Sequence, residues 1–426
     1  MGVAYLTIKG NNETMGTAQM QKNTSRWNIA TAGIVTQLML GTVYAWSVFK
    51  KPLMSAHGWS GPEVGFTFTL TIFFIGVSAA FGGRLVDRAG SRSVARIAAL
   101  LFGMGTILAG LAANIGSKWL LWAGYGVISG IGNGLGYITP IAVLVRWFPD
   151  RKGMITGLAV MGFGLGAALM GQLAPLLILK IGVGNTLYIS GGIFLLVLFF
   201  AAQKLANPTS DQILSLSTNG KKAVSPPESV DFRTARSMYQ FYLLWGVLFV
   251  NVTAGIALLS NLSPMAQSQV GLDALAAGTL ILVCSLFNGL GRVCWACLSD
   301  KVGRKLTFLL ILGTQVPAFI LLPRVTDVWL FGALCCYVLF CYGGGFATMP
   351  AFAVDTFGPK NIGSIYGPIL LAWGVAGVVG PVLMEAINKS SGHFDTALLI
   401  AAGMLVLGFA LTVLYRKPNT LSVRPQ

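Results

Sequence analysis

Twelve long apolar segments separated by short polar stretches dominate this chain of 426 residues. A helix that crosses a bilayer needs about 20 apolar residues, a length close to that of each segment. In a hydrocarbon environment a helix satisfies its own backbone polar groups, which makes it the favoured structure for such a segment. The sequence therefore predicts an all-α membrane protein with twelve transmembrane helices. The segments run over 27–49, 64–85, 94–113, 119–145, 154–178, 185–203, 240–262, 275–298, 306–322, 328–353, 364–387 and 396–415.

The composition excludes two other classes of protein. The chain is 55% hydrophobic and 10% charged, whereas a soluble domain carries about 25% charged residues. The net charge is +16, but the basic residues are too sparse for a nucleic-acid-binding surface. The apolar content is too high for a disordered chain. We expect a multi-pass protein whose surroundings are lipid and which has no nucleic-acid partner.

A polar interruption divides the twelve segments into six and six. It gives two pseudo-symmetric six-helix bundles joined by a solvated linker. We expect a tail at 1–26, a first bundle at 27–203, the linker at 204–238, a second bundle at 239–415 and a tail at 416–426.

Lysine and arginine placement predicts the orientation. If the N-terminus is inside, the inside segments carry 22 basic residues and the outside loops carry six. Cytoplasmic loops are enriched in Lys and Arg. Both termini should therefore be cytoplasmic, and we expect the cell (inner) membrane as the location.

The two halves repeat a short motif at the inner end of their second helix. Gly83-Arg-Leu-Val-Asp87-Arg-Ala-Gly90-Ser-Arg92 in the first half corresponds to Asp300-Lys-Val-Gly303-Arg304-Lys in the second. The motif resembles the loop signature of the major facilitator superfamily, whose fold is the two-bundle arrangement described above. The resemblance implies a role in conformational gating for Asp87, Arg88, Gly90, Arg92, Asp300, Gly303 and Arg304. Anchoring at anionic headgroups is the simpler alternative.

A closer resemblance covers the chain from about residue 27 to 415. It rests on Gly41-Thr-Val-Tyr44-Ala-Trp46-Ser47, on Arg146-Trp-Phe-Pro-Asp-Arg-Lys-Gly153, and on Leu286-Phe-Asn288-Gly-Leu-Gly-Arg292. These motifs are similar to those of the oxalate–formate antiporter family, a branch near the monocarboxylate transporters. The resemblance implies transport of small carboxylates.

Arg292 is the most informative residue, because it lies eight residues before Asp300 and so well inside the bilayer. A charge there costs about 2.5–3.5 kcal/mol on insertion scales, and a guanidinium does not lose its proton. No Asp or Glu lies near the middle of a segment. A substrate carboxylate is then the natural counter-ion, and the family's carboxylate-binding arginine falls at this position.

Further candidates surround Arg292. Asn288 precedes it by one helical turn and would either contact the substrate or hold the guanidinium; an inter-helix hydrogen bond is the alternative. Gln37 shares a polar stripe with Tyr44 in the first helix. The resemblance assigns cavity-lining positions to four aromatic residues, Tyr44, Tyr137, Tyr342 and Phe346. For each of them, core packing or anchoring at the membrane interface is the alternative.

Trp373 stands where the oxalate transporter carries a second intramembrane cation, a lysine. One fixed charge balances one carboxylate, and a dianion would leave a net negative charge in a low dielectric. We therefore predict a monocarboxylate substrate of the lactate, pyruvate or formate type. Oxalate:formate exchange is the alternative. An uncompensated arginine in the empty site favours anion exchange, or symport in which a proton accompanies the substrate.

The sequence lacks the residues that three other classes of function need. A carboxylate sensor would want a soluble signalling domain, an intramembrane enzyme would want a dyad or metal cluster in the spans, and a drug exporter would want a buried acid. We expect no catalytic residue, no cofactor, no metal site and a monomer. Cys294 and Cys297 form a CxxC pair, which we interpret as buried thiols.

Overall fold

The computed structural model describes residues 25–209, 212, 229–391 and 394–418. Within these residues the chain is helical and has no β-strand. Twelve spans in the described residues are long and apolar enough to cross a membrane. The prediction of an all-α, twelve-helix membrane protein is confirmed. Most of the predicted N-terminal tail, most of the linker and the end of the C-terminal tail lie outside the described residues.

The first six spans form one bundle, and two of them are interrupted. The first consists of α2 (Arg26–Gly41), the 3₁₀-helix η1 (Thr42–Ala45) and α3 (Trp46–His57). The fourth consists of α6 (Lys118–Leu121), the π-helix η2 (Trp122–Ser129) and α7 (Gly130–Trp147). The others are α4 (Gly61–Ala89), α5 (Ser91–Ile115), α8 (Lys152–Ile181) and α9 (Val183–Lys204).

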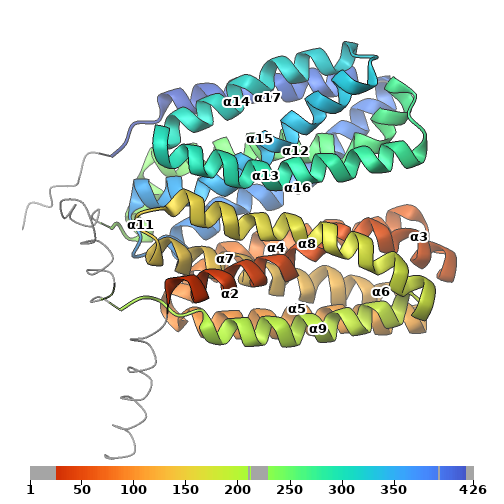
Figure 1. Cartoon of the computed structure of the whole chain (residues 1–426), viewed down its shortest axis with the longest axis horizontal. Helices are drawn as coiled ribbons and strands as arrows, with labels where there is room; N and C mark the ends of the chain where they lie inside the picture. Colours follow the sequence, from red (N-terminus) through yellow and green to blue (C-terminus); the bar gives the residue numbers. More distant parts are fainter. Residues whose placement is uncertain (1–24, 210–211, 213–228, 392–393, 419–426) are drawn as a thin grey trace, which may run out of the picture.

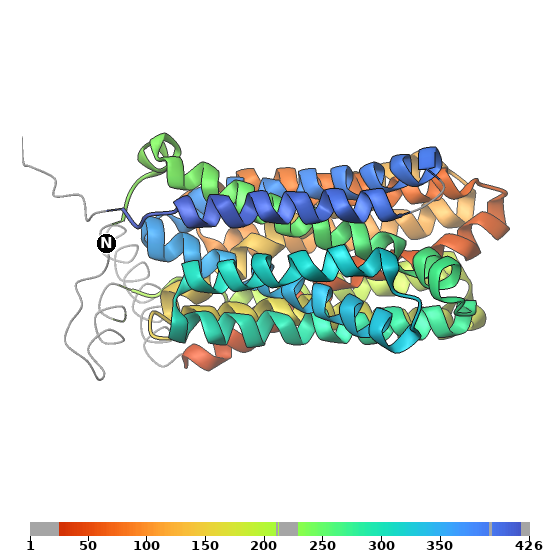
Figure 2. The same ribbon diagram turned by 90° about the horizontal axis from the view of Figure 1, so that it is seen from above.

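The last six spans form the second bundle, which lies beside the first with its helices running in the same general direction (Figures 1 and 2). A short helix, α11 (Phe232–Ser237), precedes it. The spans are α12 (Tyr239–Val270), α13 (Ala274–Val302), α14 (Arg304–Leu321), α15 (Val328–Phe357), α16 (Ile362–Ser391) and α17 (Asp395–Leu414), with the 3₁₀-helix η3 (Leu322–Arg324) after α14. We call the end that carries α11 the linker end.

Several helices extend past the predicted apolar segments, because caps rather than hydropathy set their ends. The predicted segment at 64–85 is part of α4, which begins at Gly61. A capping box stabilises this start: the Glu63 N–H donates to Ser60 Oγ (3.4 Å), and the Ser60 N–H donates to Glu63 Oε2 (2.9 Å). Hydropathy gives no weight to such polar capping residues. A prediction from hydropathy therefore places the start of α4 too late in the sequence.

The two bundles meet along two helix pairs, α4 with α16 and α8 with α13. Glycines permit the close approach of α4 to α16. A Cβ at Gly83 would lie 1.6 Å from the carbonyl oxygen of Gly363, and one at Gly76 would lie 2.7 Å from the Cα of Gly374. Any larger side chain at Gly83 would therefore force the bundles apart near the linker end.

A carboxylate from the first bundle binds the start of a helix from the second bundle at the linker end. Asp87 accepts hydrogen bonds from the backbone N–H (2.7 Å) and the hydroxyl (2.6 Å) of Ser364, in the first turn of α16. It also pairs with Arg146 at 2.8 Å. Arg146 in turn donates to the carbonyl oxygens of Pro359 (3.1 Å) and Lys360 (2.8 Å) across the bundle interface. A carboxylate at a helix N-terminus is stabilised by the helix dipole.

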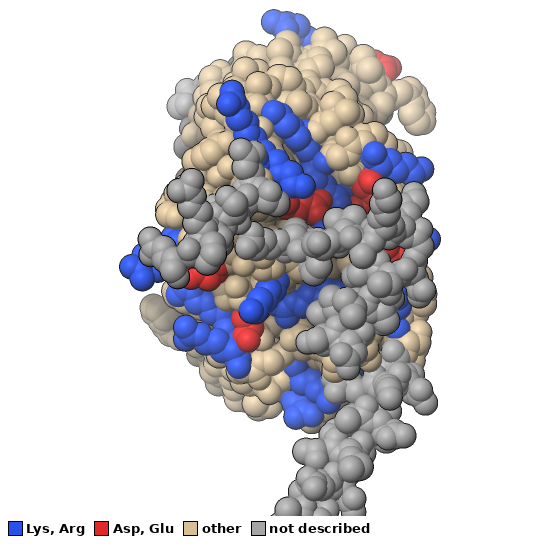
Figure 3. Space-filling view, turned by 90° about the vertical axis from the view of Figure 1, so that its left-hand side faces the viewer, with Lys and Arg blue, Asp and Glu red and all other residues tan. Residues whose placement is uncertain are grey.

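A carboxylate of the second bundle makes the equivalent contact with the start of a helix in the first bundle. Asp300 accepts hydrogen bonds from the N–H groups of Gly153 (2.9 Å) and Met154 (2.8 Å) in the first turn of α8. Lys152 pairs with Asp355 at 2.7 Å, and Arg304 pairs with Asp300 (2.6 Å) and Asp355 (2.9 Å). Acidic side chains lie between basic ones on this face (Figure 3). The linker end is thus closed by reciprocal contacts between the bundles.

The residues predicted to gate fall into three groups. Asp87 and Asp300 belong to the contacts that join the bundles, and Arg304 pairs with Asp300 and Asp355 within the second bundle. Arg88 and Arg92 are exposed and make no ion pair with a described residue. Gly90 (φ +84°) and Gly303 (φ +92°) form the tight turns between helices. Their gating role stays a prediction.

The interpretation of Cys294 and Cys297 as buried thiols is wrong for Cys294, which is exposed, and Cys297 is half-buried. Both lie on α13, and the face of α13 that carries Cys294 points away from the protein interior. Because both the lipid-facing and the interior faces of a spanning helix are apolar, hydropathy does not distinguish them.

The glycine contact between α4 and α16 leads to a first prediction. Gly83→Ala should favour opening of the linker end, because its Cβ occupies the place of the Gly363 carbonyl. The measurement is the distance between spin labels at exposed Ser93 and Lys301, in a variant without native cysteines. We expect a shift to longer distances.

The matched control is Gly192→Ala, because a Cβ at this helical glycine meets no atom within 4 Å. Alanine favours helix over glycine by about 1 kcal/mol, so both variants should fold. An unchanged distance distribution in Gly83→Ala would show that the close approach does not control closure.

Candidate functional site

Arg292 lies at the interface between the bundles and is 2% exposed. Its Nε donates to Oδ1 of Asn288, one turn earlier on α13, at 3.0 Å. Its Nη1 crosses to α8 and donates to the carbonyl oxygen of Val160 at 3.0 Å. The guanidinium is therefore held by one bundle and touches the other.

No described carboxylate neutralises this charge. None of the ion pairs among the described residues includes Arg292. Its Nη2 makes no hydrogen bond to a described residue, so a donor remains free. A buried cation with a free donor suits an anionic partner.

Five aromatic rings from both bundles pack beside Arg292. Trp373, which is fully buried, is at the centre of this aromatic cluster. Its ring lies 5.0 Å from Phe346, 5.3 Å from Tyr137, 5.9 Å from Phe163 and 6.3 Å from Tyr44, between centroids. The Arg292 guanidinium lies 5.7 Å from the Phe346 ring centre. The cluster provides an apolar wall next to a positive charge.

Several buried polar atoms in and around the aromatic cluster have no hydrogen-bond partner. They include the hydroxyls of Tyr137 and Tyr366, the indole N–H of Trp373 and Oε1 of Gln37. Buried polar groups are usually paired, so such a group of unpaired atoms needs an explanation. A small polar ligand would supply the missing partners.

Irregular backbone and close helix contacts position these side chains. Tyr44 lies on η1, the 3₁₀ break between α2 and α3. The residue before this break, Gly41, packs so close to α8 that a Cβ would lie 1.8 Å from the Phe163 carbonyl oxygen. Gly343 likewise brings α15 against α13, beside the backbone of Asn288. Short-range irregularity in spanning helices is common at functional sites.

The structure brings the predicted substrate-site residues together. Arg292, Asn288, Tyr44, Tyr137, Phe346 and Trp373 lie in one cluster. The Tyr342 ring lies 6.3 Å from that of Phe346, between centroids. Of the contacts considered for Asn288, the structure shows the one that holds the guanidinium. Gln37 is buried, and its amide donates to the Tyr137 carbonyl oxygen (3.1 Å), so it braces α7.

Three groups at the site were not identified from the sequence. They are the Phe163 ring, the Tyr366 hydroxyl and the Val160 carbonyl. The one sequence signal was for Phe163, a large aromatic residue inside the glycine-rich run Gly162–Gly166. A backbone carbonyl leaves no signal in a sequence at all.

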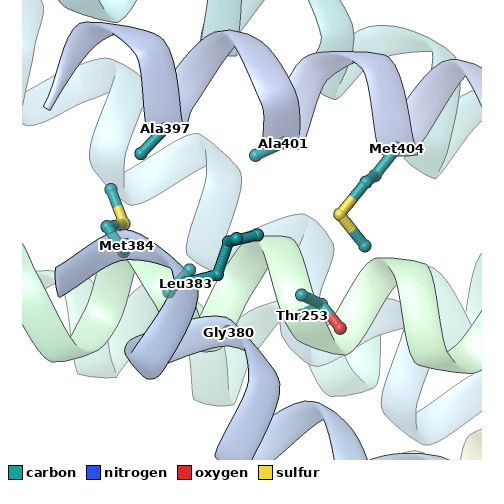
Figure 4. A pocket seen from close by; sticks show the side chains of 8 residues that line it. Thr253, Gly380, Leu383, Met384, Ala397, Ala401 and Met404 are labelled. Atoms are coloured by element: carbon teal, nitrogen blue, oxygen red, sulfur yellow. The ribbon is translucent and has the colours of Figure 1, made fainter. Parts of the chain in front are cut away.

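A separate crevice between α12, α16 and α17 is too small to be an alternative substrate site. It has a volume of about 10 Å³ and an almost entirely apolar lining (Figure 4). This is about the space that one water molecule needs.

Similarity to known proteins agrees with the fold. An oxalate:formate antiporter of Oxalobacter formigenes is 30% identical over 401 residues, covering 91% of this chain and 90% of the relative. Human monocarboxylate transporter 10 is 24% identical over 343 residues, covering 76% of this chain and 64% of the relative.

Among solved structures, the human organic anion transporter MFSD10 has a TM-score of 0.71 at 15% identity, covering 92% of this chain and all of that one, which shows the fold. The family model described as Major Facilitator Superfamily matches residues 31–369 and 244–425. The chain therefore belongs to the Major Facilitator Superfamily, as its repeated loop motif predicts, and it is a multi-pass membrane protein with a transporter fold.

Proposed function

We propose that this protein is a secondary active transporter of small monocarboxylates, with the substrate carboxylate neutralising Arg292. The observation that carries the proposal is the buried guanidinium, which touches both bundles and has no described counter-ion. The transport of oxalate and formate by a relative 30% identical supports an organic anion as the substrate.

The charge of the site favours one carboxylate. Among the described residues, Arg292 is the one cation that lies against a ring of the aromatic cluster, and Trp373 packs against the four other rings. A second carboxylate would be buried without a partner, which is costly. The aromatic wall suits the short alkyl group of a small acid such as lactate or pyruvate.

The arrangement supports alternating access. Arg292 lies between bundles that touch at the linker end through contacts that can break and re-form. We propose that this end faces the cytoplasm, in agreement with the Lys and Arg distribution, and that the membrane is the inner membrane. When the site is empty, the uncompensated charge opposes passage through a closed state, which favours exchange or entry of a proton with the substrate.

Oxalate:formate exchange is the second candidate, because the relative that carries it covers most of this chain. Counterflow of labelled lactate, formate and oxalate into proteoliposomes, with and without a pH gradient, distinguishes the two. Our proposal expects lactate or formate to exchange much faster than oxalate. Oxalate exchange at an equal rate would contradict it.

Arg292→Ala should reduce monocarboxylate counterflow by at least about thirtyfold, because losing a buried charge partner costs roughly 2–5 kcal/mol. Arg292→Lys should also lose most transport, since an ammonium does not reproduce the planar set of donors. Arg96→Lys, a conservative change at an exposed position, is the control. Counterflow at the wild-type rate in Arg292→Ala would contradict the proposal that this residue binds the substrate.

Trp373→Lys should add the second cation that a dianion needs. We expect oxalate counterflow to rise at least about tenfold relative to lactate, because close charge pairs couple by roughly 1.5–7 kcal/mol. Trp373→Met is the matched control, since it removes the ring and supplies no charge. An equal oxalate gain in both variants would mean that space rather than charge sets the preference.

Asn288→Asp should place a carboxylate where Oδ1 already accepts from Arg292. The internal ion pair should weaken substrate binding by roughly tenfold to a hundredfold, the range for a hydrogen bond to a charged group. It should also raise the melting temperature. Asn288→Ala removes the brace without supplying a charge, so it should bind more tightly than Asn288→Asp; the reverse order would argue against a missing counter-ion.

A further inference from the structure

A second cavity lies at the linker end, away from the aromatic cluster. It has a volume of about 840 Å³ and lies between the start of α14, the last turns of α15 and the residues after α17. Four basic side chains line it, against one acidic side chain: Arg304, Lys305, Arg416 and Lys417 against Asp355. We call this cavity the basic groove.

Two of these basic side chains have no ion-pair partner among the described residues. Arg304 and Asp355 pair with each other, and Lys305 donates to the carbonyl oxygens of Val413 and Tyr415 that end α17, both at 2.8 Å. Arg416 and Lys417 are exposed and form no ion pair with a described residue. The basic groove therefore carries positive charge that the described part of the chain does not neutralise.

The rest of the basic groove is apolar and continues toward the bilayer. Leu306, Leu309 and Phe352 line it, and Leu306 is 47% exposed on the outer face of α14. Because the spanning helices end here, the basic side chains lie at the level of lipid headgroups and the leucines lie at the level of acyl chains. A free phosphate would use only the basic part, whereas a phospholipid would use both.

We propose that the basic groove binds one anionic phospholipid, with its phosphate at Arg416 and Lys417 and an acyl chain along Leu306 and Leu309. Basic pockets between spanning helices suit such headgroups. Asp355 lines the basic groove and also pairs with Lys152 of the first bundle, one of the contacts that close the linker end. Arg304, which lines the basic groove too, pairs with Asp355 and with Asp300. The bound lipid therefore lies directly beside these closing contacts.

Native mass spectrometry of the purified protein, titrated with phosphatidylglycerol or with phosphatidylcholine of the same chains, tests the proposal. We expect one phosphatidylglycerol to bind more tightly than phosphatidylcholine. The double variant Arg416→Gln/Lys417→Gln should weaken that binding by roughly thirtyfold, from the usual strength of two basic residues near an anionic surface. Arg233→Gln/Arg236→Gln removes the same charge from exposed positions on α11 and should change it less than about twofold.

Glycerol 3-phosphate and inorganic phosphate serve as chain-free probes, and we expect neither to displace the lipid at millimolar concentration. Displacement would identify the basic groove as a phosphate site and would overturn the proposal that it binds a phospholipid. Equal binding of both phospholipids, or equal loss in both double variants, would overturn it as well. Melting temperatures of the two double variants establish that each is folded.

Discussion

One guanidinium, buried between two bundles without a described carboxylate, is the constraint on which the rest of this structure depends. A permanent charge in the membrane interior is costly, and arginine does not escape that cost by losing a proton. The protein offers Arg292 an amide oxygen on its own helix and one backbone carbonyl across the interface. Dipoles hold the cation in place but do not neutralise it. The aromatic cluster keeps water out, so an anion binding there meets an unscreened charge.

The same interface has a second polar region at the linker end, and there the charges are balanced. Asp87 and Asp300 each accept hydrogen bonds from the first turn of a helix in the opposite bundle. These contacts are at the protein edge, where water can replace them when the bundles separate. Tight glycine packing between α4 and α16 lets the bundles approach closely when this end is closed. In our proposal, a central site that binds the substrate and an edge that opens are the two elements of alternating access.

The sequence predicted the features that depend on local composition. Hydropathy predicts the twelve apolar segments, and spacing predicts the repeat of Asp87 and Asp300. The distribution of charge predicts that Arg292 has no acidic partner. Features that depend on packing were not. Phe163 and the Val160 carbonyl reach the site only because α8 crosses α13 there, and Gln37 turns to the α7 backbone. The sequence predicted Cys294 to be buried, whereas it is exposed. Hydropathy does not separate the two cases, because the lipid and the protein interior are equally apolar.

The most direct test of the central claim is a structure of the protein with a bound monocarboxylate such as lactate. The account predicts one carboxylate oxygen within about 3 Å of Nη2 of Arg292, the distance typical of a charge-assisted hydrogen bond. It also predicts that the alkyl group lies against Trp373 and Phe346. A lactate bound elsewhere, with Arg292 paired to a carboxylate of the protein itself, would contradict the account.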